Sequence, residues 1–131
     1  MSSAASGVVT IPCGPTVEDA LRRLTGLLEG KQLTVFAVVD HSGEAAQAGL
    51  TMPDTKLVIF GNPAAGTDLM VAAPLVALDL PLKLLLWEDG AGGVFVSYNT
   101  PEYLADRYGL SEEHTARLRP IVAIAEAVAS R

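Results

Sequence analysis

The sequence has few of the residues from which metal sites and nucleophilic sites are usually built. It holds one cysteine, Cys13, and two histidines among 131 residues. A single cysteine excludes an internal disulfide and is compatible with a reducing cytoplasm. Two histidines exclude a multi-histidine site within one chain, and no ligand pair has helical or Cys-x-x-Cys spacing. We therefore expect no metal site, and the sequence does not identify a cofactor.

Basic residues, aromatic residues and long apolar runs are also scarce. Nine Lys and Arg residues face 15 Asp and Glu residues, which gives a net charge of −6, and the basic residues are dispersed. Nucleic-acid binding needs a cationic surface, so this function class is disfavoured, and we expect no nucleic-acid partner. No apolar run reaches the roughly 18 residues that span a bilayer, and MSSAASG at the N-terminus has no signal-peptide pattern. We expect a cytoplasmic protein without a membrane partner.

Half of the residues are apolar and 18% are charged, which is typical of one globular domain with a sizeable core. We expect a disordered lead-in over residues 1–6 and a domain over residues 7–131. The densest apolar runs lie between Leu57 and Glu88.

Periodicity and punctuation predict the elements. Strands are expected at 7–12, 33–39, 56–60, 80–88 and 94–98, and helices at 16–29, 43–48 and 63–72, with one more turn at 75–78. Helices also begin at Thr100-Pro101 and at Ser111, and Pro120 should kink or split the last one. The apolar run at 33–39 indicates a strand in the middle of the sheet. The order β-α-β-(α)-β-(α)-β-β-α-α predicts an α+β fold with a largely antiparallel sheet.

Four blocks of the chain carry a family resemblance: DHSGEAAQAGL at 40–50, LVIFGNPAAGTDLM at 57–70, ALDLPLKLLLWED at 77–89 and VSYNTPEYLADRYGL at 96–110. In this order they resemble the DUF302 family, which has the TT1751-like fold. The resemblance implies a compact α+β fold of one sheet packed by helices, and homodimers as a plausible state. It implies no activity, because the family is named for its lack of an assigned function.

The segment from Gly61 to Thr67 (GNPAAGT) spells most of a phosphate-binding loop. The lysine that should follow the second glycine is missing, and Thr67 stands in its place. Pro63 also removes one of the amides that would hold a phosphate. Nucleotide hydrolysis is therefore disfavoured. Gly61, Asn62, Gly66 and Thr67 stay candidates for a simpler ligand site, and the alternative is a strand-to-helix turn that needs Gly and Pro for its geometry.

Two further groups could carry chemistry. Asp40 and His41 end a strand, where a carboxylate can orient an imidazole, but Asp40 could instead cap the next helix. Lys83 interrupts an apolar run, on the strand face of Leu85 and Trp87. If buried, it could serve as a base or an anion ligand, and otherwise it pairs with an acid or points to solvent. Tyr98 could add a polar group to a pocket.

Three functional hypotheses follow. The first is a module that binds a small anionic or partly apolar molecule, with Asp40, His41, Asn62, Thr67 and Lys83 as its polar groups. The second is an enzyme in which Lys83 and the Asp40/His41 pair act as acid and base within one pocket. The third is a structural or partner-binding homodimer with a contact over residues 75–86. The sequence assigns no catalytic residue.

Overall fold

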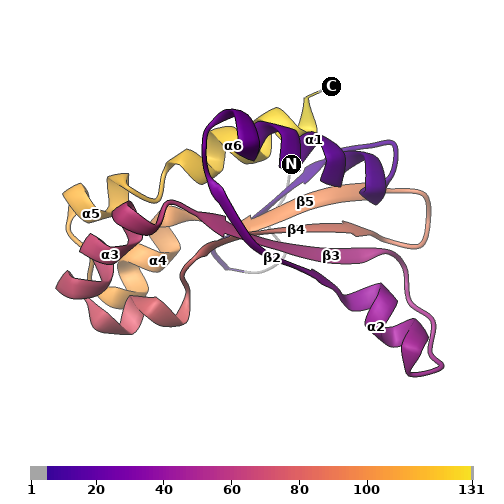
Figure 1. Ribbon diagram of the computed structural model, residues 1–131, viewed down its shortest axis with the longest axis horizontal. Helices are drawn as coiled ribbons and strands as arrows, with labels where there is room; N and C mark the ends of the chain where they lie inside the picture. The colour runs from indigo at the N-terminus through magenta and orange to yellow at the C-terminus, as the bar shows by residue number, and fades with distance from the viewer. Residues whose placement is uncertain (1–5, 131) are drawn as a thin grey trace.

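The computed structural model describes residues 6–130 as one five-stranded sheet with helices packed around it (Figure 1). The strands are β1 (Val8–Pro12), β2 (Thr34–Asp40), β3 (Thr55–Gly61), β4 (Leu82–Glu88) and β5 (Val94–Asn99). The helices are α1 (Val17–Gly30), α2 (His41–Gln47), α3 (Pro63–Ala72), the 3-10 helix η1 (Pro74–Leu78), α4 (Pro101–Tyr108), α5 (Glu112–Ala116) and α6 (Pro120–Ala129). This confirms the predicted α+β class. The predicted lead-in over residues 1–6 lies, except for Ser6, outside the described residues.

The strand order is β1-β5-β4-β3-β2, and every neighbouring pair is antiparallel. β4 and β5 form the predicted hairpin, and Asp89 closes its loop by accepting hydrogen bonds from the amides of Ala91 and Gly93 at 2.8 and 2.9 Å. The sheet therefore has two edges, β1 and β2.

The prediction that the strand at 33–39 lies in the middle of the sheet is wrong. β2 is an edge strand that pairs only with β3, and residues 34–38 are all exposed. A continuous apolar run shows that a strand has no polar face, but it does not show whether neighbours cover that strand. Here the run marks an uncovered apolar edge, with Phe36 48% exposed.

The main core lies between the sheet and the helices α1 and α6, which run side by side over one face (Figure 1). Alternate strand residues such as Phe60, Leu84 and Val96 are fully buried there. α1 begins where predicted, because the Thr16 hydroxyl accepts a hydrogen bond from the amide of Asp19 at 3.0 Å and caps the helix.

A second, smaller core joins α3, η1, α4 and the junction between α5 and α6 at one end of the sheet. Its buried members are Leu69, Val76, Leu104 and Leu118. The predicted break at Pro120 is confirmed, since α5 ends at Ala116 and α6 starts at Pro120. Proline is tolerated in the first turn of a helix but not in its interior, so the chain turns there and the α5–α6 junction faces α3.

Candidate functional site

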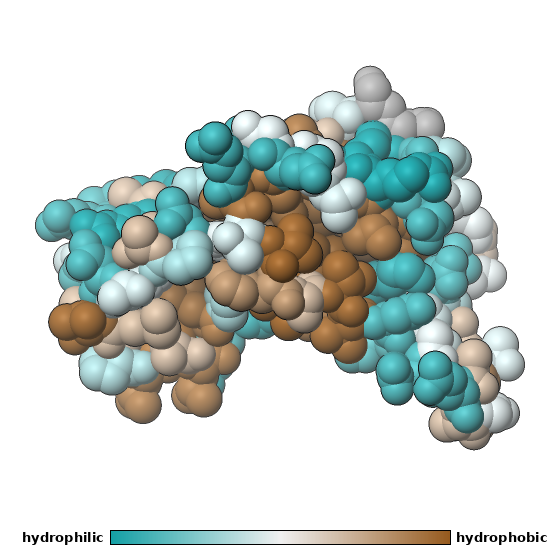
Figure 2. All heavy atoms as spheres, in the orientation of Figure 1, coloured by the Kyte–Doolittle hydropathy of each residue, from teal (hydrophilic) through white to brown (hydrophobic). Residues whose placement is uncertain are grey.

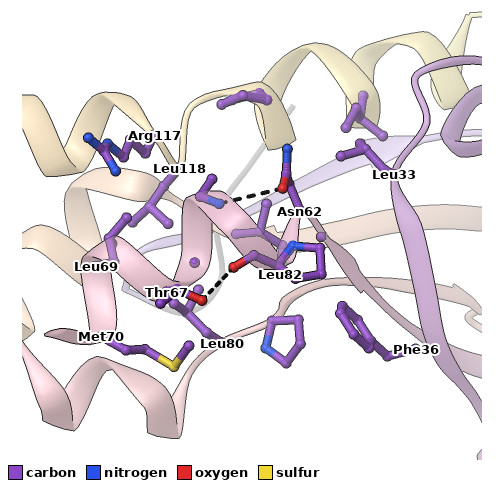
Figure 3. Close-up of a pocket in the computed structure, with 17 residues that line it drawn as sticks. Leu33, Phe36, Asn62, Thr67, Leu69, Met70, Leu80, Leu82, Arg117 and Leu118 are labelled. Carbon is purple, nitrogen blue, oxygen red and sulfur yellow. Dashed lines mark hydrogen bonds between the residues drawn. The ribbon is translucent and has the colours of Figure 1, made fainter.

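A cavity of about 440 Å³ lies between the start of β2, α3, the segment before β4 and the α5–α6 junction. Its walls are mostly hydrophobic, as Figure 3 shows. The hydrophobic lining residues are Leu33, Phe36, Leu69, Met70, Leu80, Leu82, Leu118 and Ile124, together with Pro63, Pro81 and Pro120. A concave site of this size and lining is typical of small-molecule binding.

Small residues keep this space open. Gly61, Ala65 and Gly66 line the cavity. A Cβ atom placed on Gly66 would meet only the Cε of Met70, at 4.0 Å, and one on Gly61 would meet the Cβ of Pro81 at 3.7 Å. A Cβ atom at position 66 is therefore accommodated with one ordinary van der Waals contact.

Few polar side chains line the cavity, and the structure gives each of them a partner. The Thr67 hydroxyl donates to the carbonyl oxygen of Pro63 at 2.7 Å. The guanidinium of Arg117 donates to the Asp68 carboxylate at 2.5 Å. It also lies 4.0 Å from the Glu113 carboxylate. This pairing holds the pKa of Asp68 below its usual value, first through the hydrogen bond from Arg117. The positive charge of Arg117 is thus largely neutralised.

The segment 61–67 is the strand-to-helix turn that its glycines and proline allow. The Asn62 side chain caps α3, and its Oδ1 accepts from the amides of Ala64 and Ala65 at 3.0 and 3.5 Å; Figure 3 draws the second of these bonds. Pro63 lies in the first turn of the helix, directly after the Asn62 cap. Because Asn62 already uses the first amides of the helix, little donor capacity remains there for an anion.

The predicted Asp40–His41 pair lies elsewhere. Asp40 caps α2, where its Oδ1 accepts from the Gly43 amide at 2.9 Å, the Ser42 hydroxyl at 2.8 Å and the Lys56 ammonium at 3.3 Å. These contacts, the Gly43 amide first, lower the pKa of Asp40. The carboxylate borders a shallower hollow of about 260 Å³ beside α2. His41 is exposed and borders neither space.

The prediction that Lys83 shares a pocket with Asp40 and His41 is wrong. Lys83 pairs in register with Ile59, whereas Asp40 pairs with Lys56, on the alternate face of β3. The ammonium of Lys83 donates to the carbonyl oxygens of Asp79 and Pro81 at 3.2 and 3.3 Å. Strand alternation points Leu82, not Lys83, toward the cavity. The sheet therefore separates the proposed acid and base.

Comparison with known proteins identifies the family. The family model "Domain of unknown function DUF302" matches residues 9–128. The chain belongs to the DUF302 family. This confirms the resemblance that the four sequence blocks carry.

Two curated relatives of the DUF302 domain are named "Fluoride-specific ion channel FluC 1", one from Brucella suis and one from Brucella abortus. Each is 38% identical over 117 residues, which is 89% of this chain and 46% or 43% of the relative. The chain thus spans less than half the length of the curated relatives that it matches. Among residues 6–130, no helix is long and apolar enough to cross a membrane.

A solved structure shares the fold of the DUF302 domain. The crystal structure of an uncharacterized conserved DUF302 protein from Bacillus stearothermophilus superposes with a TM-score of 0.79. It covers 95% of this chain and 97% of its own, at 17% sequence identity. At this identity the likeness supports the fold.

The remaining candidate, Tyr98, is a core residue of the DUF302 domain. It is 7% exposed on the covered face of β5, and burial, with smaller contributions from Glu126 and Glu102, raises its pKa. Of the eight predicted site residues, Gly61, Asn62, Gly66 and Thr67 meet at the cavity, and Asp40, His41, Lys83 and Tyr98 lie away from it.

Sequence reasoning missed the opposite wall. Leu33 and Phe36 come from the edge strand, and Arg117, Leu118 and Ile124 come from the α5–α6 junction. The helix that the sequence predicts from Ser111 onward would carry Leu118 on its apolar stripe, and Pro120 marks the turn that aims the α5–α6 junction at α3. These signals predicted burial and a break, but they did not indicate that the break faces Gly66.

Proposed function

We propose that the DUF302 domain binds a small, largely apolar molecule in the cavity between β2, α3 and the α5–α6 junction. The observation that carries this proposal is the lining: a space of about 440 Å³ walled by Leu, Ile, Phe, Met and Pro side chains. Burial of a ligand's apolar surface against such walls would contribute about 25 cal/mol per Å² before the costs of association.

An apolar ligand fits better than an anionic one. An anion that leaves water needs hydrogen-bond donors or unpaired positive charge in its site. Here Arg117 pairs with Asp68, and the first amides of α3 bond to Asn62. The amide nitrogen of Asn62, at the exposed rim, could serve one polar group of the ligand.

Binding of aminoanthracene, an apolar fluorophore, tests the proposal, with hexanol and hexanoate as matched competitors. Hexanol is expected to displace the fluorophore, and hexanoate to displace it far less, because the two differ mainly in the charged end group. If hexanoate competes as well as hexanol, the site accepts anions and the apolar assignment is wrong.

A matched pair of variants places the binding. Gly66→Leu fills the cavity, and Gly26→Leu makes the same change at an exposed position of α1, where an added Cβ meets nothing within 4 Å. Gly66→Leu should weaken aminoanthracene binding about tenfold or more, because a tenfold rise in Kd corresponds to a loss of only about 1.4 kcal/mol of binding free energy. Gly26→Leu should leave it unchanged. Both variants should be slightly stabilised, by up to about 1 kcal/mol, because leucine favours a helix over glycine.

The names of the Brucella relatives favour a second candidate. We propose that the DUF302 domain acts as an accessory unit beside a fluoride channel. In each Brucella relative the segment that matches this chain is less than half of the protein, and the remainder would be the channel. The cavity itself is not suited to fluoride, because a small anion needs the donors that Asn62 and Asp68 occupy. Fluoride efflux from vesicles holding the Brucella suis relative, with and without the matched segment, tests this role. Equal efflux from both would refute it.

A further inference from the structure

The cavity has a buried floor and an exposed rim. Three of its lining residues, Leu69, Leu118 and Ile124, are only 1–3% exposed and form the floor. At the rim, Phe36 is 48% exposed, and Asn62 is exposed as well. Figure 2 shows hydrophobic surface over β2 and again over the lobe of α3 and η1, and β2 and α3 both line the cavity. The space is therefore apolar at its depth, and its polar side chains lie toward the solvent.

The floor lies at the boundary between the two hydrophobic cores. Ile124 belongs to the main core, whereas Leu69 belongs to the smaller one. Leu82 packs against both cores and also lines the cavity. The lining residues spread from Phe36 on β2 to Met70 on α3, as Figure 3 shows. A flexible chain that follows this boundary would bury its methylene groups against both cores.

Aliphatic side chains make up nearly all of the apolar lining. Among the described residues that line the cavity, Phe36 alone is aromatic, and it lies at the rim. An aromatic ligand gains most where it can stack on other rings, and the floor offers none. Met70 has a flexible, unbranched side chain, which fits itself to irregular apolar shapes. The lining therefore favours an aliphatic ligand.

Asn62 offers a hydrogen-bond donor at the rim. Its Oδ1 accepts from the amides of Ala64 and Ala65, so the group that is left for a ligand is Nδ2, which can only donate. The other polar groups of the lining are engaged, since the Thr67 hydroxyl donates to Pro63 and Arg117 pairs with an acid. The end group that fits this rim is therefore a neutral hydrogen-bond acceptor.

We propose that the ligand is a neutral single-chain amphiphile, an unbranched aliphatic chain that ends in a carbonyl or hydroxyl group. The chain lies along the boundary between the two cores, and the oxygen of its end group accepts a hydrogen bond from Nδ2 of Asn62. This inference rests on the proposed function, because it concerns the same cavity. It adds the shape of the ligand, its direction and the chemistry of its polar end.

The volume of the cavity sets the length of the chain. A water molecule takes up roughly 30 Å³ of liquid, and a methylene group is of similar size. A cavity of about 440 Å³ therefore holds on the order of 14 such groups. Because the end group and the open rim take part of this space, chains of about ten to twelve carbons should fill it.

Displacement of aminoanthracene by the straight-chain methyl ketones from hexanone to tetradecanone tests the chain. A ketone accepts hydrogen bonds and donates none, so it matches the proposed end group. Each added methylene should lower the dissociation constant about fourfold, because each one buries the same additional apolar area. The gain should stop near dodecanone. If aminoanthracene binds but ketones of every length displace it equally, the chain assignment is overturned and the proposed apolar site stands; if aminoanthracene itself does not bind, both are overturned.

Gly66→Leu tests whether the cavity sets the chain length. The variant places an isobutyl group at the cavity wall and should shorten the chain at which the affinity levels off by about three to four carbons. Gly26→Leu makes the same change at an exposed position of α1 and should leave this length unchanged. The same limiting length in both variants would show that the chain lies elsewhere and would overturn the proposal.

Asn62→Asp tests the end group. Aspartate keeps the helix cap but replaces the amide donor by an acceptor. Binding of decanone should weaken about fivefold or more, as expected for the loss of one hydrogen bond. Gln47→Glu makes the same change from amide to carboxylate at an exposed position of α2 and should leave decanone binding unchanged. Equal binding of decanone to Asn62→Asp and to the wild type would overturn the proposed direction of the ligand.

Discussion

Asn62→Ala is the substitution that most sharply separates the role of Asn62 as a helix cap from a role as a ligand-binding residue. The Asn62 Oδ1 accepts hydrogen bonds from the amides of Ala64 and Ala65, and the side chain is exposed at the cavity rim. Removal of the side chain leaves these two amides to water, but removes little apolar surface from the cavity. The expected result is a loss of stability with nearly unchanged binding of an apolar molecule.

The size of this loss follows from the cap. Replacement of an Asn cap by Ala typically costs about 1 kcal/mol, within a range of about 0.5–2. α3 has ten residues and its cap is exposed, so a value near 1 kcal/mol is expected. Urea unfolding followed by Trp87 fluorescence measures it. With a urea slope of about 1–3 kcal/mol per molar for small proteins, the midpoint should fall by roughly 0.3–1 M.

Asn62→Asp is the matched control. Aspartate caps a helix as well as asparagine does, and its charge is favourable at a helix N-terminus by about 0.3–1 kcal/mol. This variant should unfold at the same urea concentration as the wild type or higher. If Asn62→Ala costs less than about 0.3 kcal/mol, or if it abolishes aminoanthracene binding while Asn62→Asp keeps it, the reading of Asn62 as a cap is wrong.

Two further predictions concern Asp40 and Cys13. The folded pKa of Asp40 is lowered by the Gly43 amide, the Ser42 hydroxyl and Lys56, so its contribution to stability is present above its unfolded pKa and is lost as pH falls through the folded value. Asp40→Ala should therefore destabilise the protein at neutral pH and converge with the wild type in acid; unfolding curves that stay equally separated at every pH would contradict this. Burial raises the pKa of the Cys13 thiol, which is 5% exposed. A thiol reagent should react with Cys13 slowly in the native protein and rapidly in urea, and rapid native reaction would show that the thiol is accessible.

Local signals in the sequence predicted most of the elements. Thr16, Thr100 and Ser111 cap the helices expected to begin beside them, and Gly109 ends α4 with φ of 64°, a backbone angle that glycine adopts without strain. Pro120 divides the last helix as expected. These features depend on neighbouring residues alone, so the chain order suffices to predict them.

The position of β2 could not be predicted in the same way. Its apolar run fits a central strand, but its pairing depends on contacts that are distant in the chain. The proposed homodimer contact over residues 75–86 is affected for the same reason, because its second half lies in a central strand. Leu84 and Leu86 are fully buried in the central strand β4 and cannot form an outer contact, while Leu75 and Leu78 are exposed.

The candidate site was half predicted. The unusual turn at residues 61–67 drew attention to Gly61, Asn62, Gly66 and Thr67, which do line the cavity. Lys83 was selected because a lysine in an apolar run is costly to bury. Its ammonium is instead held by the carbonyl oxygens of Asp79 and Pro81, a backbone arrangement that leaves no pattern in the sequence.

The most direct test of the account is methyl NMR of the wild-type protein titrated with hexanol. The account predicts that the perturbed signals belong to Leu69, Leu82, Leu118 and Ile124, which line the cavity from separate segments. The Gly66→Leu variant should lose these changes, and Gly26→Leu should keep them. Saturable changes at methyl groups far from the cavity, or no saturable change at any methyl group, would contradict the claim that this cavity binds an apolar ligand.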